Sequence, residues 1–266
     1  MCGIAGFVDA VAPPSAGQTL PRMTDRIARR GPGDTGLFAE SSASIAHRWL
    51  GIIVSSELGH QPIANADWNC PAGFGGEIFN HAAIRPAPEL AHHRYKSGTD
   101  TDAETILGSS EQCGQDCVTH FRGMFVFAIW DWQRQLLFCA GDRLSIKPSY
   151  FGYDGNIFAF ASEMKALLEH PAIGMRQNEK LASEYPAFGY TSGEDTLFVG
   201  IRLYRDMPGP DRIAMKSDTD WICDPRRRIG ERVAGSGLRL TTERSCGDRI
   251  TRNVLEILAG VAKCAG

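Results

Sequence analysis

The chain has 266 residues, 43% of them hydrophobic and 22% charged, a composition that excludes disordered and fibrous classes and is typical of a folded globular protein. Its 28 basic and 31 acidic side chains leave a net charge of −3, which provides no general attraction for nucleic acid or an anionic membrane surface. Because no stretch approaches the roughly 18 apolar residues of a membrane span and the start lacks an export signal, we expect a cytoplasmic protein without nucleic-acid or membrane partners.

The first nine residues predict a buried strand with Cys2 at its start. Once Met1 is removed, Cys2 would carry both a thiol and a free α-amino group, and an amine with a pKa near 8 can serve as the base for its own thiol. A strand held in a sheet also fixes a chain end that would otherwise fray. A cysteine at the second position also arises by accident of translation start, so the rest of the chain has to decide between the two interpretations.

The following segments alternate between helix and strand patterns. Residues 20–30 predict a helix, which Arg30-Gly31-Pro32 ends. Strand-like runs follow at residues 43–54 and 73–79. Residues 101–119 then predict a second helix, with Asp102 as its N-cap.

Two hairpins complete the predicted sheets. Apolar runs at residues 123–130 and 136–140 are joined by a short polar turn, and Tyr153-Asp154-Gly155-Asn156 provides the turn of a second hairpin. Residues 162–169 return to a helical pattern. Hairpins mixed with separate helices indicate an α+β layered fold rather than a parallel sheet.

After about residue 210 the composition changes. Residues 225–248 are rich in Arg, Gly, Ser and Thr without a clear period, and only residues 249–263 regain helical periodicity. We expect a domain at residues 1–210, followed at residues 211–266 by a linker or the truncated start of a second domain, partly disordered. The periodic tail fits either a docking helix or a chance pattern in an unstructured tail.

The eight cysteines are too dispersed for a disulfide scaffold. Cys113, Cys117 and His120 have a spacing that suits one helix face, but no second ligand pair of zinc-type spacing accompanies them. We therefore predict no metal site and no cofactor.

Seven further motifs accompany Cys2 in a consistent order. They are Arg30-Gly31-Pro32, Gly59-His60-Gln61-Pro62, Gly76-Glu77-Ile78-Phe79-Asn80-His81, Asp102-x-Glu104, Gly123-Met124-Phe125, Asp142-Arg143-x-x-Ile146-Lys147-Pro148 and Ala161-Ser162-Glu163-Met164-Lys165-Ala166-Leu167. With these motifs the chain resembles the glutaminase half of glutamine-hydrolysing asparagine synthetases, which are class II glutamine amidotransferases. The resemblance runs from residue 1 to about residue 209.

The resemblance implies a four-layer αββα sandwich of two antiparallel sheets, of the N-terminal nucleophile hydrolase type. It also implies hydrolysis of L-glutamine to glutamate and ammonia through a thioester on Cys2, with the backbone N–H of Gly76 binding the oxyanion. Asp102 would bind the substrate's α-ammonium, since an ionised carboxylate forms strong charge-assisted hydrogen bonds. The implied substrate-binding positions are Trp49, Ile52, Ile53, Gly75, Glu77 and Asp102.

Two positions depart from the family pattern. Trp49 stands where the family has the arginine that binds the substrate α-carboxylate, and Gly75 stands where it has the asparagine that shares the oxyanion. Losing one oxyanion donor costs about 3 kcal/mol and losing a charged hydrogen bond about 1.5–3 kcal/mol, so activity would fall by roughly three to four orders of magnitude or more. Arg48 could replace the missing arginine only if a bulge or a register slip turned it inward, because neighbouring strand residues point to opposite faces.

The family's ATP-binding Ser-Gly-Gly-x-Asp-Ser sequence is missing from these 266 residues, so we expect a glutaminase domain that supplies ammonia to a separate synthetase chain. Two alternatives stay open. One is a catalytically silent binding or scaffold domain, which the two substitutions favour. The other is an N-terminal-cysteine amidase for a different substrate, since Trp49 would favour an apolar group over a carboxylate.

Overall fold

The structure is a computed structural model that describes residues 2–9, 16–40, 42–50, 60–65, 70–85, 101–154, 156–182, 184–191, 193–204, 212–216 and 239–241. Its described strands form two antiparallel sheets. One sheet has the order β2 (Asp34–Glu40), β3 (Ala43–Trp49), β1 (Gly3–Asp9), β8 (Ile157–Ala161), β7 (Tyr150–Tyr153), β9 (Ile201–Leu203). The other has the order β11 (Arg239–Thr241), β10 (Arg212–Lys216), β6 (Leu136–Gly141), β5 (Gly123–Asp131), β4 (Ala72–Ile78).

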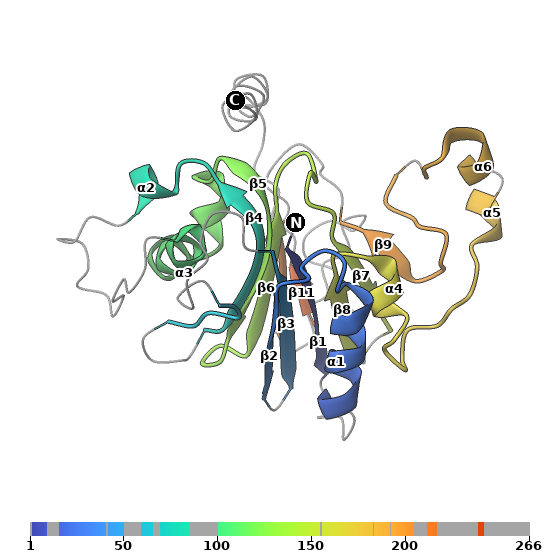
Figure 1. Ribbon diagram of the computed structural model, residues 1–266, viewed down its shortest axis with the longest axis horizontal. Helices are drawn as coiled ribbons and strands as arrows, with labels where there is room; N and C mark the ends of the chain where they lie inside the picture. The colour runs from blue at the N-terminus through green and yellow to red at the C-terminus, as the bar shows by residue number, and fades with distance from the viewer. Residues whose placement is uncertain are drawn as a thin grey trace.

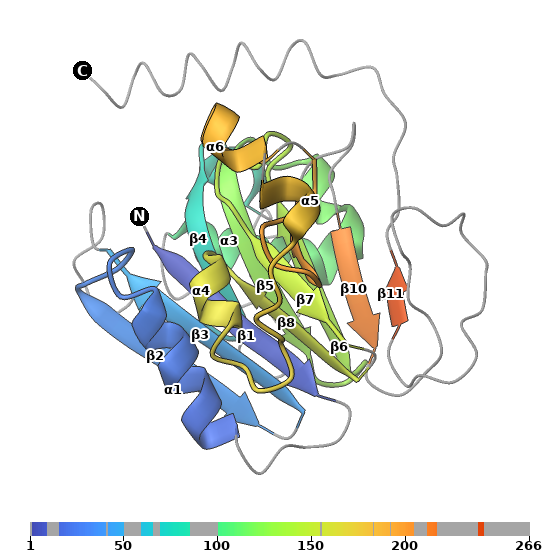
Figure 2. The same cartoon turned by 90° about the vertical axis from the view of Figure 1, so that its right-hand side faces the viewer.

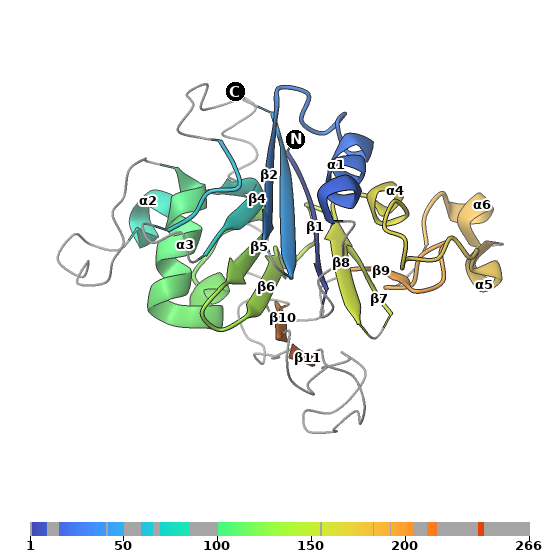
Figure 3. The ribbon, with the colours of Figure 1, turned by 90° about the horizontal axis from the view of Figure 1, so that it is seen from below.

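Helices cover the outer face of each sheet, which produces four layers (Figures 1 and 3). The sheet that contains β5 is covered by α3 (Asp102–Cys113), with α2 (His81–Ile84) and the 3₁₀ helix η3 (Gly114–Thr119) beside it. The sheet that contains β1 is covered by α1 (Ala16–Arg26) and α4 (Met164–Leu167) (Figure 2). Two short helices, α5 (Glu179–Ala182) and α6 (Glu184–Phe188), lie beyond this layer.

The hydrophobic core follows these layers, and β1 illustrates why. All seven residues of β1 are buried, and successive strand side chains point to opposite faces. Ile4 and Val8 therefore pack between the sheets against residues such as Val126. Phe7 points the other way and packs under the helices with Met23.

The predicted α+β sandwich and both predicted hairpins are confirmed. Several boundaries differ. The first helix begins at Ala16 and ends at Arg26, because bonds such as Arg30 N–H to Ile27 O tighten the chain into turns before the Gly31-Pro32 break. The helix predicted over residues 162–169 is only the four residues of α4, since Ser162 lies in a bend and Glu163 precedes the helix in extended backbone.

The helix predicted over residues 101–119 is divided at Gly114 into α3 and η3. The prediction of Asp102 as its N-cap is wrong. Thr101 is the N-cap, because its backbone is extended and its side chain accepts a hydrogen bond from the N–H of Glu104. Asp102 is instead the first helical residue, which frees its carboxylate to turn toward β4.

Part of the tail joins the second sheet, since β10 pairs with β6 and β11 pairs with β10. The periodic segment 249–263 lies outside the described residues. The division of the chain at residue 210 stays a prediction. None of the described helices combines the length and the apolar character that crossing a membrane requires.

Candidate functional site

Cys2 lies directly before β1, one of the two central strands of its sheet. This strand pairs with β3 on one side and β8 on the other. Its half-buried sulfur accepts a hydrogen bond from the backbone N–H of Leu50 at 3.4 Å. The thiol is therefore held where β3 ends, with a backbone donor already directed at the sulfur.

β4 of the opposite sheet brings two glycines to this position. A β-carbon on Gly75 would lie 3.4 Å from the carbonyl oxygen of Cys2, which is ordinary van der Waals contact. Gly76 has φ +144°, and a β-carbon there would lie 2.1 Å from the carbonyl oxygen of Met124. Only glycine fits position 76, because L side chains avoid this backbone conformation and the space is occupied.

Asp102 approaches the same strand from the helical side. Its Oδ2 atom accepts a hydrogen bond from the backbone N–H of Ile78 at 3.1 Å. Burial raises the pKa of the Asp102 carboxyl, while this hydrogen bond and the nearby His81 oppose the rise. The carboxylate thus lies at the end of β4, two residues beyond Gly76, and a bound cation would favour its ionised form.

Lys147 adds a cation to the site. It belongs to the motif from Asp142 to Pro148, but the sequence analysis gave it no role. Burial lowers the pKa of Lys147, and the positive charge of Arg30 lowers it further. The charges of Asp142, Cys2 and Glu77 oppose this shift, so these groups gather around the lysine.

The buried carboxylate of Asp142 holds the loop that carries Lys147. It accepts hydrogen bonds from the backbone N–H groups of Phe125, Leu144, Ile146 and Lys147 at 3.0–3.2 Å. Burial raises the pKa of Asp142, and these four donors oppose the rise. Because Phe125 is the register partner of Gly76, the loop is anchored beside the glycine pair. The motif from Asp142 to Pro148 was visible in the sequence. The residues that its loop contacts, such as Phe125, lie elsewhere in the chain, so the motif alone did not reveal the arrangement.

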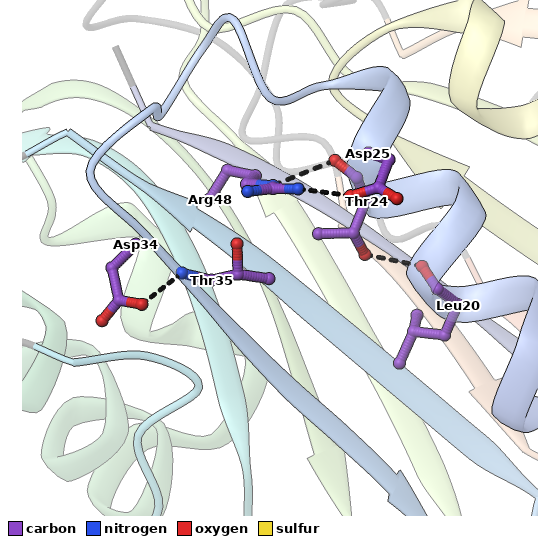
Figure 4. A network of polar contacts seen from close by, with 6 residues as sticks. All are labelled: Leu20, Thr24, Asp25, Asp34, Thr35 and Arg48. Atoms are coloured by element: carbon purple, nitrogen blue, oxygen red, sulfur yellow. Dashed lines mark hydrogen bonds and ion pairs between the residues drawn. The ribbon is translucent and has the colours of Figure 1, made fainter.

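Arg48 and Trp49 occupy opposite faces of β3. The guanidinium of Arg48 donates from Nε to the carbonyl oxygen of Thr24 at 3.2 Å and from Nη2 to Asp25 at 2.5 Å (Figure 4). These partners belong to α1, so Arg48 faces the outer helical layer. Trp49, one residue on, is half-buried, and its backbone carbonyl accepts a hydrogen bond from Gly33.

The remaining candidate positions divide between described and undescribed residues. Glu77 is half-buried in β4, whereas Ile52 and Ile53 lie outside the described residues. Cys117 is buried in the core beneath α3, and Cys113 is exposed. Within the described ranges, histidine, cysteine and acidic side chains do not gather in a group of three or more that could hold a metal ion.

The arrangement combines the thiol of Cys2, the strand β4 with Gly76, where no other residue fits, and the buried carboxylate of Asp102 at the end of that strand. A thiolate at Cys2 could attack a carbonyl carbon presented along β4, and backbone N–H groups beside it could bind the developing oxyanion. The carboxylate of Asp102 could bind a cationic group.

Comparison with known proteins identifies similar chains. The model of the glutamine amidotransferase domain family matches residues 1–219. Asparagine synthetase [glutamine-hydrolyzing] 3 of Bacillus subtilis is 37% identical over 210 residues, covering 77% of this chain and 34% of that protein. A putative asparagine synthetase [glutamine-hydrolyzing] 2 of Methanocaldococcus jannaschii is 34% identical over 196 residues, covering 67% and 37%. The chain thus spans about a third of the length of the curated relatives it matches.

Two solved structures share the fold at low sequence identity. The allosteric regulatory enzyme of purine biosynthesis superposes with a TM-score of 0.57 at 15% identity, covering 91% of this chain and 49% of that one. Glutamine phosphoribosylpyrophosphate amidotransferase from Bacillus subtilis, complexed with ADP and GMP, gives a TM-score of 0.53 at 14% identity and the same coverage. These similarities show the fold alone.

Proposed function

Because the chain belongs to the glutamine amidotransferase domain family, we propose that it hydrolyses L-glutamine to glutamate and ammonia through a thioester on Cys2. The observation that carries the proposal is that Cys2 faces Gly75 across the interface between the two sheets, where a β-carbon on Gly75 would contact the Cys2 backbone, and that Gly76 follows next on the same strand. This arrangement supports the interpretation that the Cys2 sulfur lies beside backbone N–H donors of β4. Acyl transfer requires such donors near its nucleophile.

The reaction proceeds in two halves after Met1 has been removed. The α-amino group of Cys2 takes the thiol proton, and the sulfur attacks the carboxamide carbon of glutamine while the carbonyl electrons move onto the oxygen. The N–H of Gly76 stabilises this oxyanion. When the tetrahedral intermediate collapses, the carbon–nitrogen bond breaks. The α-ammonium group of Cys2 then returns its proton to the departing ammonia. Water then attacks the thioester, which releases glutamate and the thiol.

The substrate orientation follows from the charges around the site. Asp102 binds the α-ammonium of glutamine, and Glu77 and Lys147 lie near the reacting end. Lys147 and Arg30 place positive charge near Cys2.

The test uses the mature protein, whose mass first has to show the loss of one methionine. Wild-type protein should release glutamate from glutamine and form a covalent adduct with 6-diazo-5-oxo-norleucine at Cys2. The Cys2→Ala variant and a version with an uncleaved N-terminal extension should be inactive, whereas Cys113→Ala, which alters an exposed cysteine, should keep full activity. A correctly processed wild-type protein that forms no adduct would contradict the proposal and favour a silent binding domain.

A second candidate function is hydrolysis of an amide without an α-carboxylate. The observation in its favour is that Arg48 is bound to α1, so it supplies no cation for a substrate carboxylate on the side of β3 that carries Trp49. A comparison of glutamine with 4-aminobutanamide, which is glutamine without its carboxylate, separates the two functions. A higher kcat/KM for 4-aminobutanamide would replace the glutaminase proposal.

We also propose that the ammonia is delivered to a separate synthetase chain in the cytoplasm. The support is that the matched relatives are named as glutamine-hydrolysing asparagine synthetases and that this chain matches only a third of their length. Mixing the protein with a synthetase that lacks its own glutaminase should make product formation depend on glutamine. Product formation that still requires added ammonia would contradict delivery to that partner.

A further inference from the structure

Two of the seven motifs, Arg30-Gly31-Pro32 and Ala161–Leu167, lie around the first residues of β1. They contribute Arg30 and Gly31 after α1, and Ser162 and Glu163 after β8, and they meet at Gly3 and Ile4, which directly follow the nucleophile. These segments are far apart in the sequence, so their convergence is a property of the fold.

Ser162 binds β1 by two hydrogen bonds to one residue. Its backbone N–H donates to the carbonyl oxygen of Ile4 at 2.9 Å, and its hydroxyl oxygen accepts from the N–H of Ile4 at 3.0 Å. The last register pair between the two strands is Ala5 with Ala161, so the serine hydroxyl replaces the carbonyl that a longer β8 would supply. Because Ser162 is only 1% exposed, water does not compete for these bonds.

Glu163 reaches Cys2 through Arg30. The Nε atom of Arg30 donates to the carbonyl oxygen of Cys2 at 3.4 Å, and its Nη1 atom lies 3.6 Å from Oε1 of Glu163. The other carboxylate oxygen of Glu163 lies 2.7 Å from Nζ of Lys165. The side chains of Arg30 and Glu163 are 13% and 27% exposed, so solvent screens this pair less than a surface ion pair.

Two glycines give Arg30 the room to do this. A β-carbon on Gly3 would lie 3.2 Å from the Cβ and Cδ atoms of Arg30, so the arginine stem lies directly over Gly3. A β-carbon on Gly31 would lie 2.3 Å from the carbonyl carbon of Arg48, which no side chain could accommodate. Gly3 and Gly31 therefore allow the guanidinium of Arg30 to approach Cys2.

We propose that Ser162 and Glu163 are positioning residues that hold Cys2 in place, Ser162 through Ile4 and Glu163 through Arg30. A terminal residue bound by its own strand alone would fray, and a displacement of about 1 Å at a reacting group can cost about 10²-fold in rate. The kinetic part of this inference depends on the proposed glutaminase activity, whereas the structural part does not.

The experiment compares Ser162→Ala and Glu163→Gln with Glu169→Gln as the matched control. Glu169 also follows β8, but it pairs with Arg26 on the outer surface, away from Cys2. Hydrogen exchange of the N-terminal peptide, read by mass spectrometry, should become about 10-fold or more faster at Gly3 and Ile4 in the first two variants and stay unchanged in the control.

The kinetic readout separates positioning from a general loss of stability. With glutamine, kcat of both variants should fall about 10-fold to 100-fold while KM stays within about 2-fold, and Arg30→Met combined with Glu163→Gln should lose little more than Arg30→Met alone. Unchanged exchange in both variants, or an equal loss in Glu169→Gln, overturns the inference. If wild-type protein does not hydrolyse glutamine, the proposed function fails while hydrogen exchange still decides whether the two residues hold Cys2.

Discussion

Gly75 lies directly against Cys2: a β-carbon on Gly75 would be 3.4 Å from the carbonyl oxygen of Cys2 and 3.8 Å from its Cβ. These are normal contact distances, so a β-carbon fits at position 75 beside the nucleophile. Position 76 has no such space, because its β-carbon would overlap the carbonyl oxygen of Met124. A β-carbon can thus be added at position 75 but not at the adjacent position 76.

The first prediction is that Gly75→Asn increases glutaminase activity. An asparagine amide at this position would add a donor for the oxyanion, and one such donor is worth about 10²–10³ in kcat. We expect kcat to rise by about 10²-fold with a smaller change in KM, measured by glutamate release. Gly76→Asn is the contrasting control and should fail to fold or lose activity. A folded Gly75→Asn variant with wild-type kcat would show that this space is not beside the oxyanion.

The second prediction concerns the α-carboxylate. Trp49→Arg should lower KM for glutamine about 10-fold or more, because a charged hydrogen bond contributes about 1.5–3 kcal/mol, and it should disfavour 4-aminobutanamide. Arg48→Met is the control, since Arg48 is bound to Thr24 and Asp25 of α1. This control should leave KM unchanged. An increase in KM for Arg48→Met would mean that Arg48 reaches the substrate.

The third prediction is that Asp102→Asn increases KM for glutamine about 10-fold to 100-fold, through loss of the charged bond to the α-ammonium. The fold should persist, because an asparagine Oδ1 can still accept the N–H of Ile78. Burial raises the pKa of Asp102, so lowering the pH should protonate it and increase KM in wild-type protein, whereas KM of the variant should not follow this titration. Glu104→Gln, in the same helical turn, should behave like wild type; an equal increase in KM there would point to general electrostatics.

The fourth prediction links stability to the buried His47. Burial lowers the pKa of His47 to about 4, although the carbonyl of Phe74 and the charge of Asp34 favour its protonated form; the charge of His60 adds to the lowering. Between pH 6.5 and 4 the unfolded chain therefore binds more protons than the native protein. The free energy of unfolding should fall by up to about 3 kcal/mol as the pH drops through this window, and should not change with this group above it.

Urea unfolding at several pH values checks this. His47→Gln should reduce the pH slope between pH 4 and 6.5, while His120→Gln, which alters an exposed side chain, should retain it. His170 is also buried with a lowered pKa, so part of the slope should remain in His47→Gln. An identical slope in wild type and His47→Gln would contradict the assignment.

The hairpins could be predicted from sequence because their strands are neighbours along the chain and their turns are short. The strand β2 could not. Most of its residues are exposed or half-buried, so it has no clear alternation, and it becomes a strand by pairing with β3 from Asp34 to Glu40. The predicted helix over residues 162–169 was too long because Ser162 binds Ile4 instead of continuing a helical turn.

For the candidate site, the resemblance carried by local motifs selected Cys2, Gly76 and Asp102 as candidates. They could not show that Arg30 reaches the carbonyl of Cys2 or that Lys147 lies near Glu77, because these contacts join segments far apart in the chain. Arg48 and Trp49 show the limit at the scale of two residues. Their alternation followed from the strand period, and the resemblance assigned Trp49 to the site, but only the structure shows that Arg48 binds Thr24 and Asp25 of α1.

The sequence by itself determined which chemical groups the protein carries and at what spacing, because residue type and local backbone preference are encoded in short segments. Only the tertiary structure decided which of these groups meet. The physical reason is that the period of a strand sets side chains on alternate faces, whereas burial of apolar residues such as Ile4 and Ile45 between two sheets selects the face that turns inward. That selection turns Arg48 toward α1 and brings Gly75 against Cys2.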